Sequence, residues 1–116
     1  PARRLSGGEQ QRLSLVRALC CNPEILFLDE PCAHLDVNAA QDVEALIKSA
    51  IEAGIKVVMI THDRAQARRF GGEILLMEGG QVKAQEGAAL FFGPSQNPWT
   101  QAFLQGYEIS DAEAET

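Results

Sequence analysis

The stretch ILFLDEP, residues 25–31, decides the fold class of this chain. It begins with an unbroken apolar run, Ile25 to Leu28, that ends abruptly in charged residues. A short, wholly apolar run of this kind is typical of a strand that is buried on both faces of a parallel sheet. Two carboxylates, Asp29 and Glu30, follow it directly, at the strand end where open α/β sheets bind their ligands.

The segments that flank this strand are predicted to be helices. Upstream, Ser6 and Glu9 have the spacing of a capping box, and the helix that they begin runs to about Cys21. Downstream, Asp36 can cap a helix over residues 37–53, in which apolar residues recur every three or four positions. The strand is therefore expected to lie between two helices that pack on a sheet.

The rest of the chain continues this alternation. A second buried strand is predicted next, over residues 56–61, and His62 follows it directly. After that strand we expect a short helix over residues 63–70 and a β-hairpin with strands at 73–77 and 81–84. A short helix or turn at 87–92 follows, and a last helix begins at residue 97 with Asn97 as its cap. This order predicts an α/β domain with a mainly parallel sheet, a terminal β-hairpin and short helices.

Size and charge limit the classes of function. The chain has 116 residues, of which 46% are hydrophobic and 22% charged, so we expect one globular domain over residues 1–107. The formal net charge of −6 argues against a nucleic-acid partner, because such proteins neutralise phosphates with basic residues. Residues 108–116 are acidic and poor in apolar residues, which predicts a disordered tail.

The cysteines and the apolar runs exclude two further classes. The cysteines are odd in number and show no Cys-x-x-Cys spacing, so we expect reduced, buried thiols rather than disulfides or a zinc site. They are Cys20, Cys21 and Cys32. No apolar run approaches the roughly 20 residues that a bilayer span requires.

The carboxylate pair after the first strand has the chemistry of a magnesium-nucleotide site. Asp29 can hold the metal ion, directly or through water, and Glu30 can orient and deprotonate a water beside the γ-phosphate. Taken alone, the pair is explained equally well as two acidic residues that cap the following turn.

Two further features lie at element ends. The stretch LSGGE, residues 5–9, brings backbone N–H groups to a helix N-terminus, where the helix dipole favours a phosphate. An ordinary capping box is the alternative. His62, at the end of the second strand, is expected at the same sheet edge as Asp29 and Glu30, and a structural histidine is the alternative there.

The order of these motifs resembles the ATP-binding cassette (ABC) family. LSGGE at 5–9 looks like its signature motif, and ILFLDE at 25–30 looks like its Walker B strand with the catalytic glutamate. AHLD at 33–36 is similar to its D-loop, and THD at 61–63 to its switch-histidine loop. The resemblance covers residues 5–63, and it implies the fold of the P-loop NTPases.

The resemblance implies a role for each motif residue, in a site where ATP and Mg²⁺ lie between two subunits. Asp29 would bind Mg²⁺, Glu30 would activate water, and His62 would contact the γ-phosphate. The residues implied to face the nucleotide of the opposite subunit are Ser6, Gly7, Gly8 and Glu9, and Asp36 is implied at the dimer interface.

The same resemblance points to a missing motif. The sequence has no Gly-x-x-x-x-Gly-Lys-Ser/Thr, the P-loop that cradles nucleotide phosphates. The chain is therefore expected to be the C-terminal half of an ABC nucleotide-binding domain and to be inactive as an ATPase by itself.

Two residues depart from the family's pattern. Cys32 and His34 stand where the family more often has a hydroxyl residue and alanine. The thiol is expected to pack in the same space. His34 is expected to be a tolerated variation, with a pH-sensitive contact as the alternative.

The leading interpretation is the ATPase subunit of a bacterial importer. QQR at 10–12 and the stretch from Phe92 to Leu104 resemble importer subunits. This implies a peripheral protein at the cytoplasmic face of the cell membrane. Its partners would be a second ATPase subunit, a transmembrane permease subunit and a substrate-binding protein. Two alternatives stay open: a non-transport ABC ATPase of translation or DNA repair, and a standalone interaction module.

Overall fold

The computed structural model describes residues 6–106, so Leu5 and the predicted tail at 108–116 lie outside the described residues. Helices and strands follow the predicted order. They are α1 (Gly7–Cys20), β1 (Ile25–Asp29), α2 (Val37–Glu52), β2 (Lys56–Ile60), α3 (Arg64–Phe70), β3 (Glu73–Glu78), β4 (Gln81–Gly87), α4 (Ala88–Phe91) and α5 (Pro98–Gln105). Among these residues, none of the helices has the length and apolar character to cross a bilayer.

The chain divides into two compact units, Pro1–His62 and Asp63–Thr116. The first holds the parallel pair β1–β2, and the second holds the antiparallel hairpin β3–β4. The α/β class is as predicted, with the parallel strands in the part that carries the candidate site.

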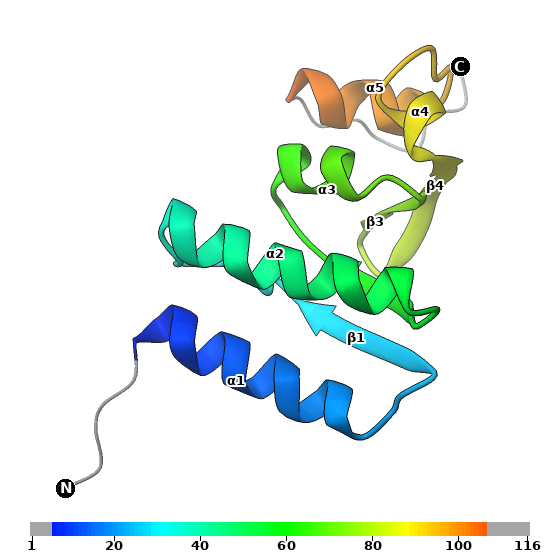
Figure 1. The fold of residues 1–116 in the computed structure, drawn as a ribbon. Coiled ribbons are helices and arrows are strands. Elements are labelled where there is room, and N and C mark those ends of the chain that lie inside the picture. The colour runs from blue at the N-terminus through cyan, green and yellow to red at the C-terminus, as the bar shows by residue number, and fades with distance from the viewer. Residues whose placement is uncertain (1–5, 107–116) are drawn as a thin grey trace, which may run out of the picture. The chain divides into compact units, whose positions relative to one another are not determined.

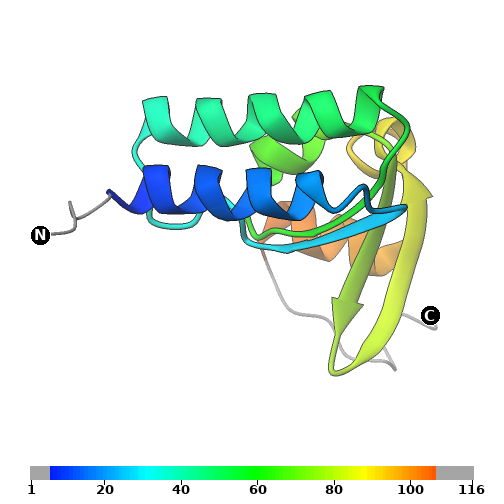
Figure 2. The same cartoon turned by 60° about the horizontal axis from the view of Figure 1, so that its bottom comes forward.

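In the first unit, α1 and α2 run side by side in the same direction (Figures 1 and 2). Helix α2 packs against β2 and buries Val43, Ile47 and Ala50, which lie on the apolar stripe predicted from the sequence. In the strand pair, Asp29 at the end of β1 is in register with Ile60 at the end of β2. The two strands therefore end at the same edge, as the parallel arrangement requires.

The expectation that both strands are buried on two faces is wrong for the described residues. Leu26 is 7% exposed, whereas its neighbour Phe27 is 73% exposed. Successive residues of a strand point to opposite faces, so one face of the pair packs inward and the other carries exposed apolar side chains. The large apolar residues exposed on the two strands are Ile25, Phe27, Val58 and Ile60.

The thiols of the first helix are not buried either, which corrects a second expectation. Cys20 and Cys21 are exposed, and Cys32 is half-buried. Cys20 is the last residue of α1 and Cys21 is its C-cap, where the helix has ended and packing on α2 no longer covers the side chains. The buried residues of α1 are instead Gly8 and Leu15.

The second unit has an aromatic core. Phe91 is almost fully buried, and its ring contacts the rings of Phe92 and Phe103. Strand β4 extends to Gly87, beyond the predicted end at residue 84, because it pairs with β3 as far back as Glu73. The hairpin is therefore longer than the apolar pattern alone indicates.

The last helix is held at both ends. At its N-terminus, the Asn97 side chain accepts hydrogen bonds from the N–H groups of Trp99 and Thr100, as the predicted cap requires. At its C-terminus, the Arg64 guanidinium donates to the carbonyls of Phe103 and Leu104, at 2.7 and 2.9 Å. These bonds satisfy carbonyls that a helix end otherwise leaves without an intrahelical partner.

Candidate functional site

The N-terminus of α1 presents the glycine-rich motif. The Ser6 hydroxyl accepts a hydrogen bond from the N–H of Glu9 at 3.1 Å, which is the predicted cap. Ser6 and Gly7 are exposed, Gly8 is buried and Glu9 is half-buried. The motif thus combines an exposed hydroxyl with the positive end of a helix dipole, an arrangement that favours an anion.

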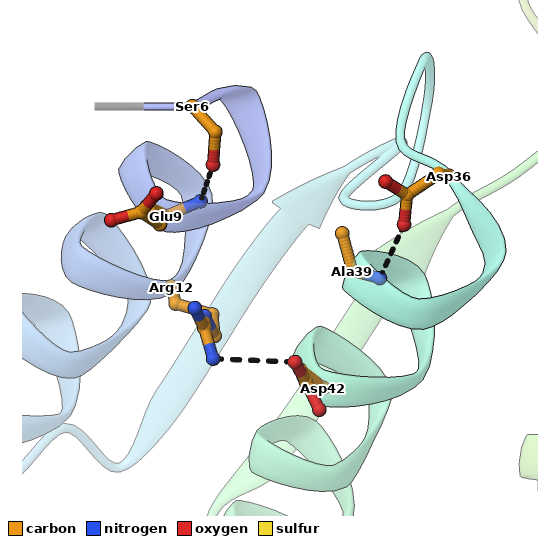
Figure 3. Close-up of polar contacts among 6 residues, drawn as sticks. All are labelled: Ser6, Glu9, Arg12, Asp36, Ala39 and Asp42. Atoms are coloured by element: carbon orange, nitrogen blue, oxygen red, sulfur yellow. Dashed lines mark hydrogen bonds and ion pairs between the residues drawn. The ribbon is translucent and has the colours of Figure 1, made fainter. Parts of the chain in front are cut away.

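The N-terminus of α2 lies at the same end of the first unit (Figure 3). The Asp36 carboxylate caps this helix by accepting from the N–H of Ala39 at 2.7 Å. Asp36 is exposed. The two caps, Ser6 and Asp36, therefore stand on neighbouring helices that begin at one end of the unit.

The ends of the parallel strands carry the acid and the imidazole. Asp29 is the last residue of β1 and is exposed, and Glu30 follows it. Oε1 of Glu30 lies 3.2 Å from Nε2 of His62, which follows the end of β2. The Glu30 side chain is 39% exposed and that of His62 is 87% exposed, so both are open to a ligand.

Glu30 adopts a backbone conformation that is unusual for a residue with a side chain. Its φ is +45°, in the left-handed region, which costs free energy in any residue except glycine. Its N–H donates to the carbonyl of Ile60 at 2.7 Å, and this bond fastens the turn to the neighbouring strand. Glu30 is thus tied to β2 by its backbone and paired with His62 by its side chain.

The loop between Glu30 and α2 holds the two residues that depart from the expected pattern. The Cys32 thiol donates to the carbonyl of Ala40 at 3.7 Å, so it packs against the first turns of α2 as expected. His34 is exposed and has a φ of +64°. Histidine is one of the residues that tolerate this conformation better than most.

The structure brings Glu30 and His62 together, whereas Ser6 and Asp36 each bond within their own helix. It also reveals partners that the sequence reasoning did not single out. Arg12 of α1 and Asp42 of α2 form an ion pair at 3.2 Å, and Gly8 lies against Ala39. In the sequence, the only indication of these contacts was the opposite charge of Arg12 and Asp42.

The carboxylate at the end of β1 suits a metal ion whose other ligands are not protein side chains. Within residues 6–106, no three side chains of His, Cys, Asp or Glu gather into a complete metal cage. Magnesium is usually bound through one or two carboxylates together with waters and substrate phosphates. The exposed Asp29 carboxylate fits that mode of binding and would need a nucleotide beside it.

The family comparison agrees with the motif order. A family model described as "ABC transporter" matches residues 1–33. The general L-amino acid transport ATP-binding protein AapP of Rhizobium johnstonii is 36% identical over 100 residues, which are 86% of this chain and 39% of that protein. The phosphate import ATP-binding protein PstB of Mycobacterium intracellulare is 42% identical over 101 residues, 86% of this chain and 35% of that protein.

Solved structures show the same fold. A dimeric ATP-binding cassette in a post-hydrolysis state bound to ADP and Pi is 40% identical, with a TM-score of 0.64 over 72% of this chain and 36% of that chain. The chain thus spans well under half the length of the relatives that it matches.

Proposed function

Because this chain belongs to the ATP-binding part of the ABC transporter family, we propose that it is a portion of the subunit that hydrolyses ATP to drive transport. The observation that carries the proposal is the pairing of Glu30 with His62 at the ends of two adjacent parallel strands, beside Asp29. A base, an imidazole and a metal-binding carboxylate at one edge are the groups that attack on a γ-phosphate requires.

In the proposed reaction, Glu30 accepts a proton from a water molecule as that water attacks the γ-phosphorus. The bond between the γ-phosphorus and the β–γ bridging oxygen breaks, and ADP and phosphate leave. His62 donates a hydrogen bond to a γ-phosphate oxygen. Asp29 would hold Mg²⁺, which would supply positive charge against the negative charge on the phosphates. Each of these residues acts mainly by position and charge.

The glycine-rich helix N-terminus acts on a different nucleotide in this proposal. Ser6, Gly7, Gly8 and Glu9 contact the ATP held by the opposite subunit, and Asp36 lies at the interface between the subunits. The sequence contains no P-loop, so the proposed site is complete only where a P-loop-bearing segment is joined to this chain.

We assign the subunit to an importer. Relatives named for amino acid and phosphate transport support this class. The proposed partners are a second ATPase subunit, a transmembrane permease subunit and a substrate-binding protein. The proposed location is the cytoplasmic face of the cell membrane, where the subunit would be peripheral. The solute is chosen by the partner chains in this arrangement.

The proposal is tested by Glu30→Gln in a subunit that joins this chain to its P-loop. The amide keeps the size of the side chain and its hydrogen bonding but cannot take the proton. We expect ATP binding to be retained and hydrolysis to fall by about 10²- to 10⁴-fold, the contribution of a positioned general base. Glu52→Gln, at an exposed position on α2, is the matched control and should hydrolyse like the parent. Near-normal turnover in Glu30→Gln would contradict the assignment.

A further inference from the structure

Helices α1 and α2 approach each other closely within their first turns. A Cβ atom placed on Gly8 would lie 2.6 Å from Cβ of Ala39 and 3.7 Å from its Cα. Two carbon atoms in favourable contact are about 3.5–4.0 Å apart, so the first of these distances is a clash. The Ala39 methyl group is fixed to the backbone, and only a shift of one helix would relieve the clash.

The neighbouring glycine of the motif is not in this situation. A Cβ on Gly7 would have Cδ2 of Leu35 as its nearest neighbour, at 3.7 Å, which is an ordinary contact. Both glycines belong to α1, and neither is among the residues with positive φ in the described part of the chain. Their backbone conformation is therefore one that a residue with a side chain can also adopt. The requirement for glycine at position 8 is therefore set by helix packing and not by backbone conformation.

The packed pair lies in the same first helical turns that the two caps close. Gly8 precedes Glu9, whose N–H is bound by Ser6, and Ala39 is itself the residue whose N–H is bound by Asp36. One turn further along, Arg12 of α1 pairs with Asp42 of α2 at 3.2 Å (Figure 3). The first turns of the two helices are thus joined by a close steric contact and, beside it, by an ion pair.

From this arrangement we infer that Gly8 and Ala39 are positioning residues, which fix Ser6 and Asp36 relative to each other so that both meet the opposite subunit as one surface. The inference rests on the proposed function, since it concerns the face that contacts the partner's nucleotide. A methyl group at position 8 would separate the helix N-termini and displace one cap from the other. The separation would weaken association of two subunits, while the nucleotide site of each single subunit would be unchanged.

The test is a compensating pair of substitutions in the P-loop-bearing subunit, with Glu30→Gln in the background so that bound ATP persists. Gly8→Ala introduces the clash, and Ala39→Gly removes the methyl group that it meets. We expect Gly8→Ala to weaken ATP-driven dimerisation on the order of tenfold, as overpacking does, and to leave ATP binding by the monomer unchanged. The double variant should regain most of the parent's dimerisation.

A matched control separates this rescue from a general effect of glycine in the helix. Ala40→Gly lies in the same turn of α2 and has the same helix-propensity cost, but it opens no room for a methyl group at position 8. Gly8→Ala combined with Ala40→Gly should therefore remain defective. Thermal unfolding without nucleotide gives a second readout: the melting temperature should fall in Gly8→Ala and rise again only when Ala39 is also replaced.

The outcomes distinguish this inference from the proposed function. If the parent dimerises with ATP and the double variant dimerises no better than Gly8→Ala, then the methyl group harms the nucleotide contact directly and the positioning role is overturned. The positioning role is also overturned if Gly8→Ala dimerises like the parent, because the added methyl group would then disturb neither the helix pair nor the nucleotide contact. If the parent itself neither binds ATP nor dimerises, the proposed function fails, and the inference that rests on it fails as well.

Discussion

The candidate site is formed by two helix N-termini, those of α1 and α2, and by two strand ends, those of β1 and β2, and these two regions are organised very differently. The N-termini of α1 and α2 are held by contacts within the chain: Ser6 and Asp36 cap their helices, and Gly8 packs on Ala39. The carboxyl ends of β1 and β2 are more open: His62 is largely exposed, Glu30 is half-buried, and the two side chains pair at 3.2 Å.

This difference indicates which part of the site is prepared in advance. The helix N-termini need no ligand to take up their arrangement, because capping and packing already fix it. The strand ends carry charged groups whose proposed partners are phosphates and a metal ion. A surface prepared in this way suits a contact with a second subunit, whereas the open strand ends suit a site that is completed by nucleotide and P-loop.

The largest effect concerns the open strand ends. We expect residues 1–116 by themselves to bind MgATP negligibly, because the nest of backbone N–H groups and the lysine of a P-loop are both absent from this sequence. Isothermal titration checks this, with the P-loop-joined subunit as the positive control. Tight binding of MgATP by the 116-residue chain would contradict this difference between the two regions, because the strand ends would then form a nucleotide site without a P-loop.

A smaller effect is expected within β1, where substitutions on its two faces should differ in their effect on the free energy of unfolding. Leu26→Ala removes a buried side chain and should destabilise the 116-residue chain by about 2–5 kcal/mol. Phe27→Ala removes a larger but exposed side chain and should change the free energy of unfolding by less than about 0.5 kcal/mol. Urea denaturation measures both. Equal destabilisation by the two variants would mean that the second face of the strand pair is also covered.

The smallest effect is expected at the ion pair between α1 and α2. The side chains of Arg12 and Asp42 are 43% and 57% exposed, and exposed pairs contribute about 0.2–1 kcal/mol. Arg12→Ala should therefore lower the free energy of unfolding by no more than about 1 kcal/mol, and the loss should shrink at high salt. A larger, salt-independent loss would show that the helix pair depends on this contact more than on Gly8 and Ala39.

Local features of the fold were predictable from the sequence. The caps at Ser6, Asp36 and Asn97 follow from residue type at a helix start, and each forms the expected bond. The meeting of Glu30 with His62 was also predictable, because adjacent parallel strands bring their carboxyl ends to one edge.

Features that depend on distant packing were not predictable. The run Ile25 to Leu28 is apolar at every position, so it contains no alternation that could distinguish the exposed Phe27 from the buried Leu26. The contact of Gly8 with Ala39 depends on how two helices cross, and no local pattern encodes that. The exposure of Cys20 likewise follows from where α1 ends relative to α2 and not from the residue's preference for burial.

The central claim is that the N-terminus of α1 meets a nucleotide held by another subunit, and Ser6→Arg tests it most directly. In the P-loop-joined subunit carrying Glu30→Gln, light scattering with ATP measures dimerisation, and titration measures ATP binding by the monomer. We predict that Ser6→Arg binds ATP nearly as the parent does but stays monomeric, because the long charged side chain fills the space for the partner's γ-phosphate. Ser14→Arg, at an exposed position on the same helix, is the matched control and should dimerise. Dimerisation of Ser6→Arg at the parent's level would contradict the account.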